Sequence, residues 1–183
     1  MYNGLDEREL AVLCSQRDRQ AEDELYMRYA AKLLTLCRRY TDDADEARDL
    51  MHDSIIKALD RISSFTYRGR GSLYAWLSRI AVNSALNNVK RYKLRFVTIA
   101  IPDSADDPPE DEIEAIPQEI LLDMISALPH TQRAVFNLFC IEGYSHREIA
   151  EMLGISEKGS ASLLAKARTR LKKKIDDYIK NSG

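Results

Sequence analysis

The sequence is poor in the residues that build turns, disulfides and membrane spans. Its 183 residues include seven Gly, five Pro and three Cys. So few Gly and Pro argue against a fold of many strands and turns, and helices are expected instead. The longest apolar runs fall far short of the roughly 20 residues that span a bilayer, and the polar, acidic N-terminus does not resemble a signal peptide. We therefore expect a helical protein that stays in the cytoplasm, with no membrane insertion.

The sequence contains no pattern typical of a metal site, a redox site or a catalytic site. Cys14, Cys37 and Cys140 lie far apart, are odd in number and form no C-x-x-C pair, so we interpret them as buried thiols rather than disulfides or metal ligands. The three histidines are equally scattered and lack the spacing of a zinc site. No nucleophile accompanies a base, and no phosphate-binding loop is found. We expect no catalytic residue, no metal and no cofactor, so an enzyme is the weakest reading.

Charge is distributed unevenly along the chain. The net charge of −2 combines 17 Lys and Arg against 14 Asp and Glu in residues 1–96, seven acids and no base in residues 97–117, and ten bases against eight acids in residues 118–183. The acidic segment also holds four of the five prolines, a composition typical of linkers. We therefore predict two small domains, residues 1–96 and 118–183, joined by an acidic, Pro-containing linker.

Apolar residues in both predicted domains recur at helical spacing. Three helices are predicted in the first domain, with stripes of Leu25, Tyr29, Leu33, Leu36 and Tyr40, then Ala47, Leu50, Met51, Ser54, Ile55, Ala58 and Ile62, then Leu73, Trp76, Leu77, Ile80, Ala81 and Ala85. Ser72 is placed to cap the third of them. Two shorter stripes follow the linker, and they stop near Pro129 and Gly143. The expected fold class is all-α.

Residues 145–174 have the pattern of a helix-turn-helix. Ser145 and Glu148 form a capping box that starts one helix, because each side chain can bind the backbone amide of the other. Gly154 permits the turn, and Ser156 is placed to cap the next helix. Ile149, Ala150, Leu153, Leu164, Ala167 and Leu171 would hold the two helices together. The C-terminal domain is therefore predicted to bind DNA.

Two segments of the chain are strongly basic. From Lys158 to Lys174 there are seven Lys and Arg and no acid, which suits a helix laid along phosphates better than a merely solvated helix end. From Arg61 to Arg95 there are eight and no acid, with Phe65, Tyr67, Tyr74 and Trp76 among them. Interleaved rings and cations bind single-stranded nucleic acid, although Trp76 lies on an apolar stripe and is expected in the core.

Asn83 and Asn87 lie one helical turn apart on a polar face of the third predicted helix. An amide both donates and accepts hydrogen bonds, so it can read a base flipped out of the stack. The alternative is that both are ordinary exposed amides.

Motifs in both halves of the chain resemble one family. The C-terminal motifs are Leu128-Pro-His-Thr-Gln-Arg133, Val135-Phe136, Glu142-Gly-Tyr-Ser145 and Glu148-Ile-Ala-Glu-Met-Leu-Gly-Ile-Ser156. The N-terminal motifs are Asp49-Leu-Met-His-Asp-Ser-Ile-Ile-Lys57-Ala, Phe65, Gly71-Ser72, Trp76-Leu77, Arg79-Ile80-Ala81 and Asn83. They resemble bacterial RNA polymerase sigma factors. Only a short linker stands where larger members carry a further domain, so the resemblance is to the extracytoplasmic-function (ECF) group.

This resemblance implies a dissociable, non-catalytic subunit that gives bacterial RNA polymerase its promoter choice. Residues 1–96 would bind core polymerase and recognise and melt the minus-10 element, and residues 118–183 would recognise the minus-35 element. The implied partners are the clamp and flap regions of core RNA polymerase, promoter DNA and, for many members, an anti-sigma factor.

The resemblance also implies three sets of site residues. Those for core polymerase are Asp49, Leu50, Met51, His52, Asp53 and Lys57. Those for minus-10 DNA are Phe65, Tyr67, Arg68, Arg70, Ser72, Arg79, Asn83, Asn87, Lys90 and Arg91. Those for minus-35 DNA are Ser145, Lys158, Ser160, Ser162, Lys166, Arg168 and Arg170.

The chain departs from the family pattern at two places. His52 and Asp53 stand where the family more often has Gln and Glu, and the neighbouring Leu50 and Met51 could belong to the core instead. Ala161 and Leu163 stand where the family usually has Lys and Arg or Gln. We therefore expect minus-35 recognition to depend on phosphate contacts and groove shape.

Two alternatives stay open at this point. A stand-alone helix-turn-helix repressor or activator, whose N-terminal domain senses a ligand or dimerises, is the second hypothesis, but it leaves the clamp-like helix and the acid-free aromatic segment unexplained. The seven acids of residues 97–117 either imitate nucleic acid or form a solvated spacer.

Overall fold

The structure is a computed structural model of the chain, and it describes residues 4–93 and 116–182. The chain divides into two compact units, Met1–Ala85 and Leu86–Gly183. Within the described ranges every regular element is a helix and no strand occurs. This confirms the predicted all-α fold class.

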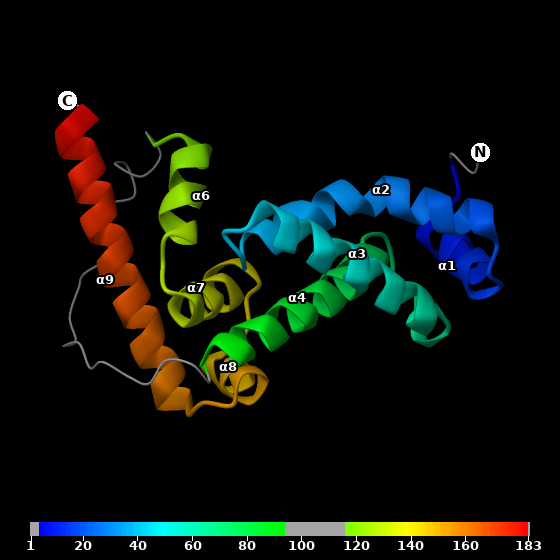
Figure 1. Ribbon diagram of the computed structural model, residues 1–183. Helices are drawn as coiled ribbons and strands as arrows, with labels where there is room; N and C mark the ends of the chain where they lie inside the picture. Colours follow the sequence, from blue (N-terminus) through cyan, green and yellow to red (C-terminus); the bar gives the residue numbers. More distant parts are fainter. Residues whose placement is uncertain (1–3, 94–115, 183) are drawn as a thin grey trace. The chain divides into compact units, whose positions relative to one another are not determined.

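Helices α1 to α4 build the first unit, and α4 continues beyond its boundary (Figure 1). Their bounds are α1 Glu7–Ser15, α2 Arg19–Arg38, α3 Ala44–Arg61, the 3₁₀ turn η1 Ile62–Ser64, and α4 Ser72–Lys93. Asp18 and Asp43 cap α2 and α3 by accepting hydrogen bonds from backbone amides of the first turn. The three predicted apolar stripes supply most of the core, which includes Leu25, Leu33 and Leu77.

Helix α1 was not among the three helices predicted for this unit. It begins with a complete capping box, in which Asp6 accepts from Glu9 N at 2.8 Å and Glu9 accepts from Asp6 N at 3.1 Å. Leu10, Ala11 and Cys14 lie on its buried face. A helix of nine residues shows its apolar period only once, so the capping box was the available signal.

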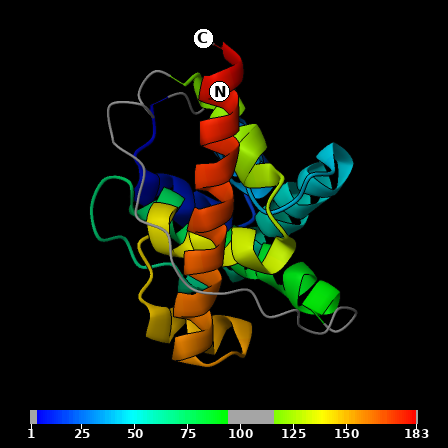
Figure 2. The ribbon, with the colours of Figure 1, turned by 90° about the vertical axis from the view of Figure 1, so that its left-hand side faces the viewer.

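Helices α6 to α9 build most of the second unit. Their bounds are α6 Gln118–Ser126, α7 His130–Phe136, the π-helical segment η2 Asn137–Ile141, α8 His146–Leu153 and α9 Glu157–Ser182. The long α9 packs against α6, α7 and α8 (Figure 2). Met124, Leu128, Ala167, Leu171 and Ile175 are buried between α6 and α9. The two stripes predicted after the linker and the helix-turn-helix thus form one helical domain.

Most of the predicted linker, residues 97–117, lies outside the described residues. Its last two residues are described. Ile116 is buried in the cluster between α6 and α9, and Pro117 occupies the N-cap position of α6. Proline is tolerated at a helix start because its missing N–H would have no intrahelical partner there.

The three cysteines do not share one environment. Cys14 and Cys37 are buried, as predicted, whereas Cys140 is exposed, and the prediction that it is buried was wrong. Cys140 lies in the π-helical segment, where the altered turn changes which residues face the core. Burial raises the pKa of Cys14 to about 11 and that of Cys37 to about 12.

We expect a maleimide reagent at neutral pH to modify Cys140 rapidly and to leave Cys14 and Cys37 untouched in the folded protein. The thiolate is the reactive species, and the raised pKa and burial of the two core thiols remove both ionisation and access. Peptide mapping by mass spectrometry measures the order of modification, and Cys140→Ser is the control that should lose the rapid phase. Equal labelling of all three cysteines would contradict the burial of Cys14 and Cys37.

Candidate nucleic-acid interface

The helix-turn-helix of the second unit is built by local hydrogen bonds. Ser145 Oγ accepts from Glu148 N at 3.3 Å, and Glu148 Oε2 accepts from Ser145 N at 2.9 Å, so the predicted capping box starts α8. Gly154 ends α8 in the left-handed conformation, with φ of 63°, which Gly adopts at little cost. Ser156 Oγ accepts from Gly159 N at 3.0 Å and starts α9. The predicted motif is present.

Helix α9 presents a polar and basic stripe. Lys158, Ser162, Lys166 and Arg170 follow at intervals of four residues, so they share one face of the helix. Lys158 and Arg170 are exposed, and Ser162 and Lys166 are half-exposed. This stripe can bind phosphates through charge and can approach base edges through its single hydroxyl.

The two departures from the family pattern lie beside this stripe. Ala161 is exposed and Leu163 is half-buried, and neither side chain can donate or accept a hydrogen bond. Arg168 is half-exposed on α9.

Ser160 departs from the expectation that it faces DNA. Its exposed fraction is 0%, and its Oγ lies 3.0 Å from Nδ1 of His146 at the start of α8. The His146 ring is in turn stacked on Phe139, with the ring centroids 4.4 Å apart. Ser160 therefore joins α9 to α8, which pack against each other. It holds α9 in place from inside the domain.

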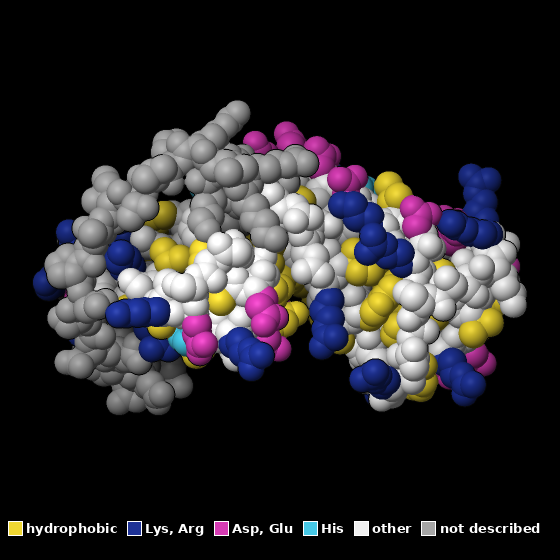
Figure 3. All heavy atoms as spheres, turned by 90° about the horizontal axis from the view of Figure 1, so that it is seen from below, with side chains coloured by type: hydrophobic (Ala, Val, Ile, Leu, Met, Phe, Trp, Pro, Cys, Tyr) yellow, Lys and Arg dark blue, Asp and Glu magenta, His cyan; other side chains and the backbone are white. Residues whose placement is uncertain are grey.

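In the first unit, α4 and the segment before it surround a hollow of about 280 Å³. Phe65, Arg68, Ser72, Trp76 and Arg79 are among the residues that line it. Arg68 and Arg79 are exposed, so charge and aromatic surface meet here. Seen from below, the space-filling view shows Lys and Arg side chains among hydrophobic ones on this unit, together with some Asp and Glu side chains (Figure 3).

Trp76 was predicted to lie in the core, and this was wrong. The residue is half-buried, its ring lies 5.6 Å from that of Phe65 at an interplanar angle of 56°, and it lines the hollow. A tilted ring pair is a favourable aromatic geometry. Trp76 thus joins the candidate surface.

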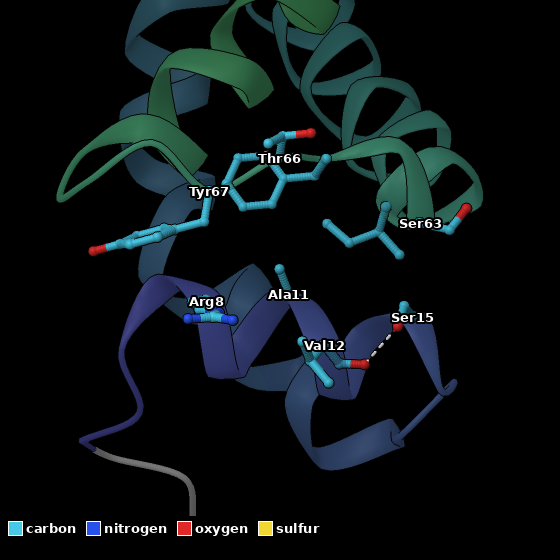
Figure 4. A pocket seen from close by; sticks show the side chains of 9 residues that line it. Arg8, Ala11, Val12, Ser15, Ser63, Thr66 and Tyr67 are labelled. Atoms are coloured by element: carbon cyan, nitrogen blue, oxygen red, sulfur yellow. Dashed lines mark hydrogen bonds between the residues drawn. The ribbon is translucent and has the colours of Figure 1, made fainter.

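A second, larger hollow of about 500 Å³ lies between α1 and residues 62–67 (Figure 4). Figure 4 places Tyr67 over Arg8 at one side of the hollow, with Ser63 and Ser15 at the other. Val12 of α1 is 49% exposed beside them. Arg8 and Val12 were not among the predicted site residues because α1 itself was not predicted.

Helix α4 carries an exposed polar face. Arg79, Asn83 and Asn87 are all exposed and follow at intervals of four residues, so they lie on one side of the helix. The predicted site residues Lys90 and Arg91 belong to α4, but their side chains lie outside the described residues. Arg70 and Tyr67 are exposed in the segment that precedes the helix.

Ser72 was predicted to cap α4, and the structure corrects this. Ser72 is the first helical residue, and its Oγ accepts from Arg68 N at 3.2 Å. The side chain therefore holds the preceding turn rather than the amides of the helix.

The residues predicted to bind polymerase divide into a buried and an exposed group. Leu50 and Met51 are 7% and 3% exposed, so they belong to the core of the domain, as the alternative held. Asp49 and Asp53 are exposed on α3, one helical turn apart. The middle of α3 therefore presents two carboxylates on its exposed side.

The other members of this set contact neighbouring helices. The ring of His52 is stacked on Tyr26 of α2, with centroids 5.8 Å apart. Lys57 Nζ donates to Ser84 Oγ of α4 at 3.2 Å. Ile56 is 58% exposed beside Asp53. It lies inside the motif that resembles the polymerase-binding helix of the family, but it was not among the predicted site residues. A large exposed apolar side chain flanked by charges is typical of a protein interface.

Residues 25–95 match the family Sigma-70 region 2, and residues 118–171 match Sigma-70, region 4. The unit with the exposed face of cations, amides and rings and the unit with the helix-turn-helix are therefore those of a transcription initiation factor of the sigma-70 type.

Relatives narrow the class to one group. The chain is 32% identical to the ECF RNA polymerase sigma factor SigM of Mycobacterium tuberculosis, over 93% of this chain and 86% of the relative. It is 31% identical to the ECF RNA polymerase sigma-E factor of Haemophilus influenzae, over 98% of this chain and 100% of the relative. The chain belongs to the ECF sigma factors, and it acts in transcription initiation.

The fold also resembles a solved complex. The sigma factor RpoE of Bartonella quintana, in complex with the anti-sigma factor NepR, matches with a TM-score of 0.52 and 22% identity, over 84% of this chain and 96% of that chain. This likeness supports the fold.

Residues 4–93 and 116–182 contain neither a membrane-spanning helix nor a metal-binding cluster. None of the helices there is long and apolar enough to cross a membrane. No group of three or more His, Cys, Asp or Glu residues is placed there to hold a metal ion.

Proposed function

We propose that the chain is a dissociable, non-catalytic subunit whose two domains divide promoter recognition. Residues 1–96 bind core polymerase and open the minus-10 element, residues 118–183 contact the minus-35 element and the polymerase flap, and residues 97–117 connect them. The observation that carries the proposal is the order of the two sigma-70 matches on a chain with a separate basic surface in each unit.

The exposed face of α3 supports a role in binding the polymerase clamp. Asp49, Asp53 and Ile56 combine two carboxylates with an exposed apolar side chain. Such a patch fits a partner surface with basic residues around an apolar centre. One face of the His52 ring is stacked on Tyr26, and the other face can contact the polymerase.

The hollow beside α4 supports minus-10 recognition. Exposed Arg68 and Arg79 can bind phosphates, and the Phe65 and Trp76 rings offer stacking surface for an unpaired base. Asn83 and Asn87 continue the same surface with amides. This combination suits single-stranded DNA better than duplex DNA.

The α9 stripe supports a weaker and less selective contact at the minus-35 element. Lys158, Lys166 and Arg170 bind phosphates, while Ser162 is the member of the stripe with a neutral hydrogen-bonding group. Each missing bidentate base contact removes roughly 1–3 kcal/mol of discrimination. We infer that the second domain contributes more to affinity than to sequence choice.

The proposal also includes regulation by a protein partner. The Bartonella protein was solved in complex with an anti-sigma factor. We propose that this chain also binds an anti-sigma factor, which holds it inactive by covering its polymerase-binding surface.

Promoter binding is expected to require core polymerase. In a mobility-shift assay at physiological salt, the free protein should bind promoter DNA no better than unrelated DNA, whereas addition of core enzyme should yield a specific, transcribing complex. The reason is that the cations of the α9 stripe bind phosphates, and such contacts give mainly non-specific, salt-dependent affinity for DNA. Tight specific binding without polymerase would favour a stand-alone regulator instead.

A further inference from the structure

Glu7 of α1 binds the start of α4. Its Oε2 accepts hydrogen bonds from Gly71 N at 2.9 Å and from Leu73 N at 3.1 Å. Its Oε1 accepts from Tyr29 Oη of α2 at 3.2 Å. One half-buried carboxylate thus ties together α1, α2 and the first turn of α4, across 64 residues of sequence.

The start of α4 needs this contact because it lacks a local cap. The first amides of a helix have no intrahelical acceptor, and an N-cap side chain normally supplies one. Gly71 stands directly before the first helical residue and has no side chain, while Ser72 Oγ is bound to Arg68 N. Glu7 therefore supplies from a distance what a local N-cap residue would supply, and its negative charge suits the positive end of the helix dipole.

The position of the carboxylate is itself fixed by buried neighbours. Tyr29 is 3% exposed, and burial, with the charge of Glu7, raises the pKa of its phenol to about 12. The phenol is consequently protonated at neutral pH and donates to Glu7. Arg28 next to it donates to Leu5 O at 2.9 Å and pairs with Glu24 at 2.8 Å, which secures the chain just before α1.

We propose that Glu7 is a positioning residue for promoter opening: by capping α4 from α1, it sets the turn that presents Arg68 and Arg70 and the direction of the helix that carries Arg79 and Asn83. The proposal rests on the proposed function, since it names a residue that prepares the minus-10 surface. It requires no contact between Glu7 and DNA.

Three substitutions separate the reach of the side chain from its charge. Glu7→Gln keeps an oxygen for the amides of Gly71 and Leu73 and an NH₂ group that can donate to Tyr29, so it should open promoters at nearly the parent rate. Glu7→Asp keeps the charge but is one methylene shorter, and Glu7→Ala removes the acceptor. Both should slow opening by roughly 3- to 30-fold, the range expected for the loss of a helix N-cap.

The measurement uses holoenzyme assembled from core polymerase and the full chain. The rate of opening is followed by the fluorescence of 2-aminopurine placed in the minus-10 element, and affinity for core polymerase is measured in parallel by competition. Affinity for core should stay within twofold of the parent for all three variants. Asp23→Ala, which removes an exposed acid from α2, is the matched control and should open promoters normally.

Three outcomes would overturn the proposal. Opening at the parent rate by Glu7→Ala would show that the cap is dispensable. Normal opening by Glu7→Asp with slow opening by Glu7→Gln would show that charge matters and reach does not. A parallel loss of core affinity and opening would show a general structural role. If the parent protein itself fails to direct core polymerase to a promoter, the proposed function fails first, and that failure is separate.

Discussion

A protein that carries Arg79→Glu and Asn83→Ala is expected to open promoters about 100-fold more slowly than the parent, or worse, and to bind core polymerase normally. Both side chains are exposed on one face of α4. Loss of an amide contact to a base removes roughly 1–3 kcal/mol, and the reversed charge adds repulsion from phosphates. Since about 1.4 kcal/mol corresponds to a factor of ten, loss of the amide contact alone accounts for roughly 5- to 150-fold, and the charge reversal brings the expected total to about 100-fold.

Permanganate reactivity of unpaired thymines in the minus-10 element measures this loss directly. A pre-melted promoter should restore part of the activity, because the cost of strand separation has then been removed. The control is Arg19→Glu, the same charge change at an exposed position of α2 outside the candidate surface. Equal opening by the double variant and the parent would remove α4 from the interface.

Replacement of Ile149 by Ala is expected to lower the free energy of unfolding of the second unit by about 2–5 kcal/mol, the usual cost of such a truncation in a core. Ile149 is fully buried between the helices of the helix-turn-helix. A domain of this size has only about 5–15 kcal/mol of stability in total, so contact with the minus-35 element should weaken severely at physiological temperature.

The single tryptophan makes the effect on each unit separable. Trp76 is the only tryptophan of the chain and lies in the first unit. Urea unfolding followed by tryptophan fluorescence should therefore be unchanged by Ile149→Ala, whereas a transition followed by far-ultraviolet circular dichroism should shift to lower urea. Ile141→Ala, at a position 41% exposed, is the matched control and should shift neither signal by more than about 0.5 kcal/mol. A shift in both signals would show that the units do not unfold independently.

Much of the architecture follows from patterns that are local in sequence. The apolar stripes of α2, α3 and α4 extend over more than three turns each, and the packing of Leu25, Leu33 and Leu77 is as their period predicts. The capping box of Ser145 and Glu148 and the left-handed Gly154 require only neighbours within a few residues. Such features are predictable because their physical cause is contained in a short window.

What escaped prediction depends on neighbours distant in the chain. Ser160 was expected to face DNA, but the ring of His146 from α8 holds it inside the domain. Trp76 was expected in the core, but Phe65 holds it at the rim of a hollow. Ser72 appeared suited to cap α4 until the structure showed Glu7 in that role. In each case a tertiary partner, and not the local sequence pattern, decided where the side chain lies.

The contact between Glu7 and the start of α4 also has a consequence for the order of folding. Helices α2 and α3 pack as sequence neighbours, and contacts of this kind cost little chain entropy to form. The bond from Glu7 to Gly71 closes a loop of more than sixty residues, so we expect it to form after α2 and α3 have packed together. We therefore expect the turn that carries Arg68 and Arg70 to be completed when α1 docks. A docked α1 would then indicate that the whole domain has folded.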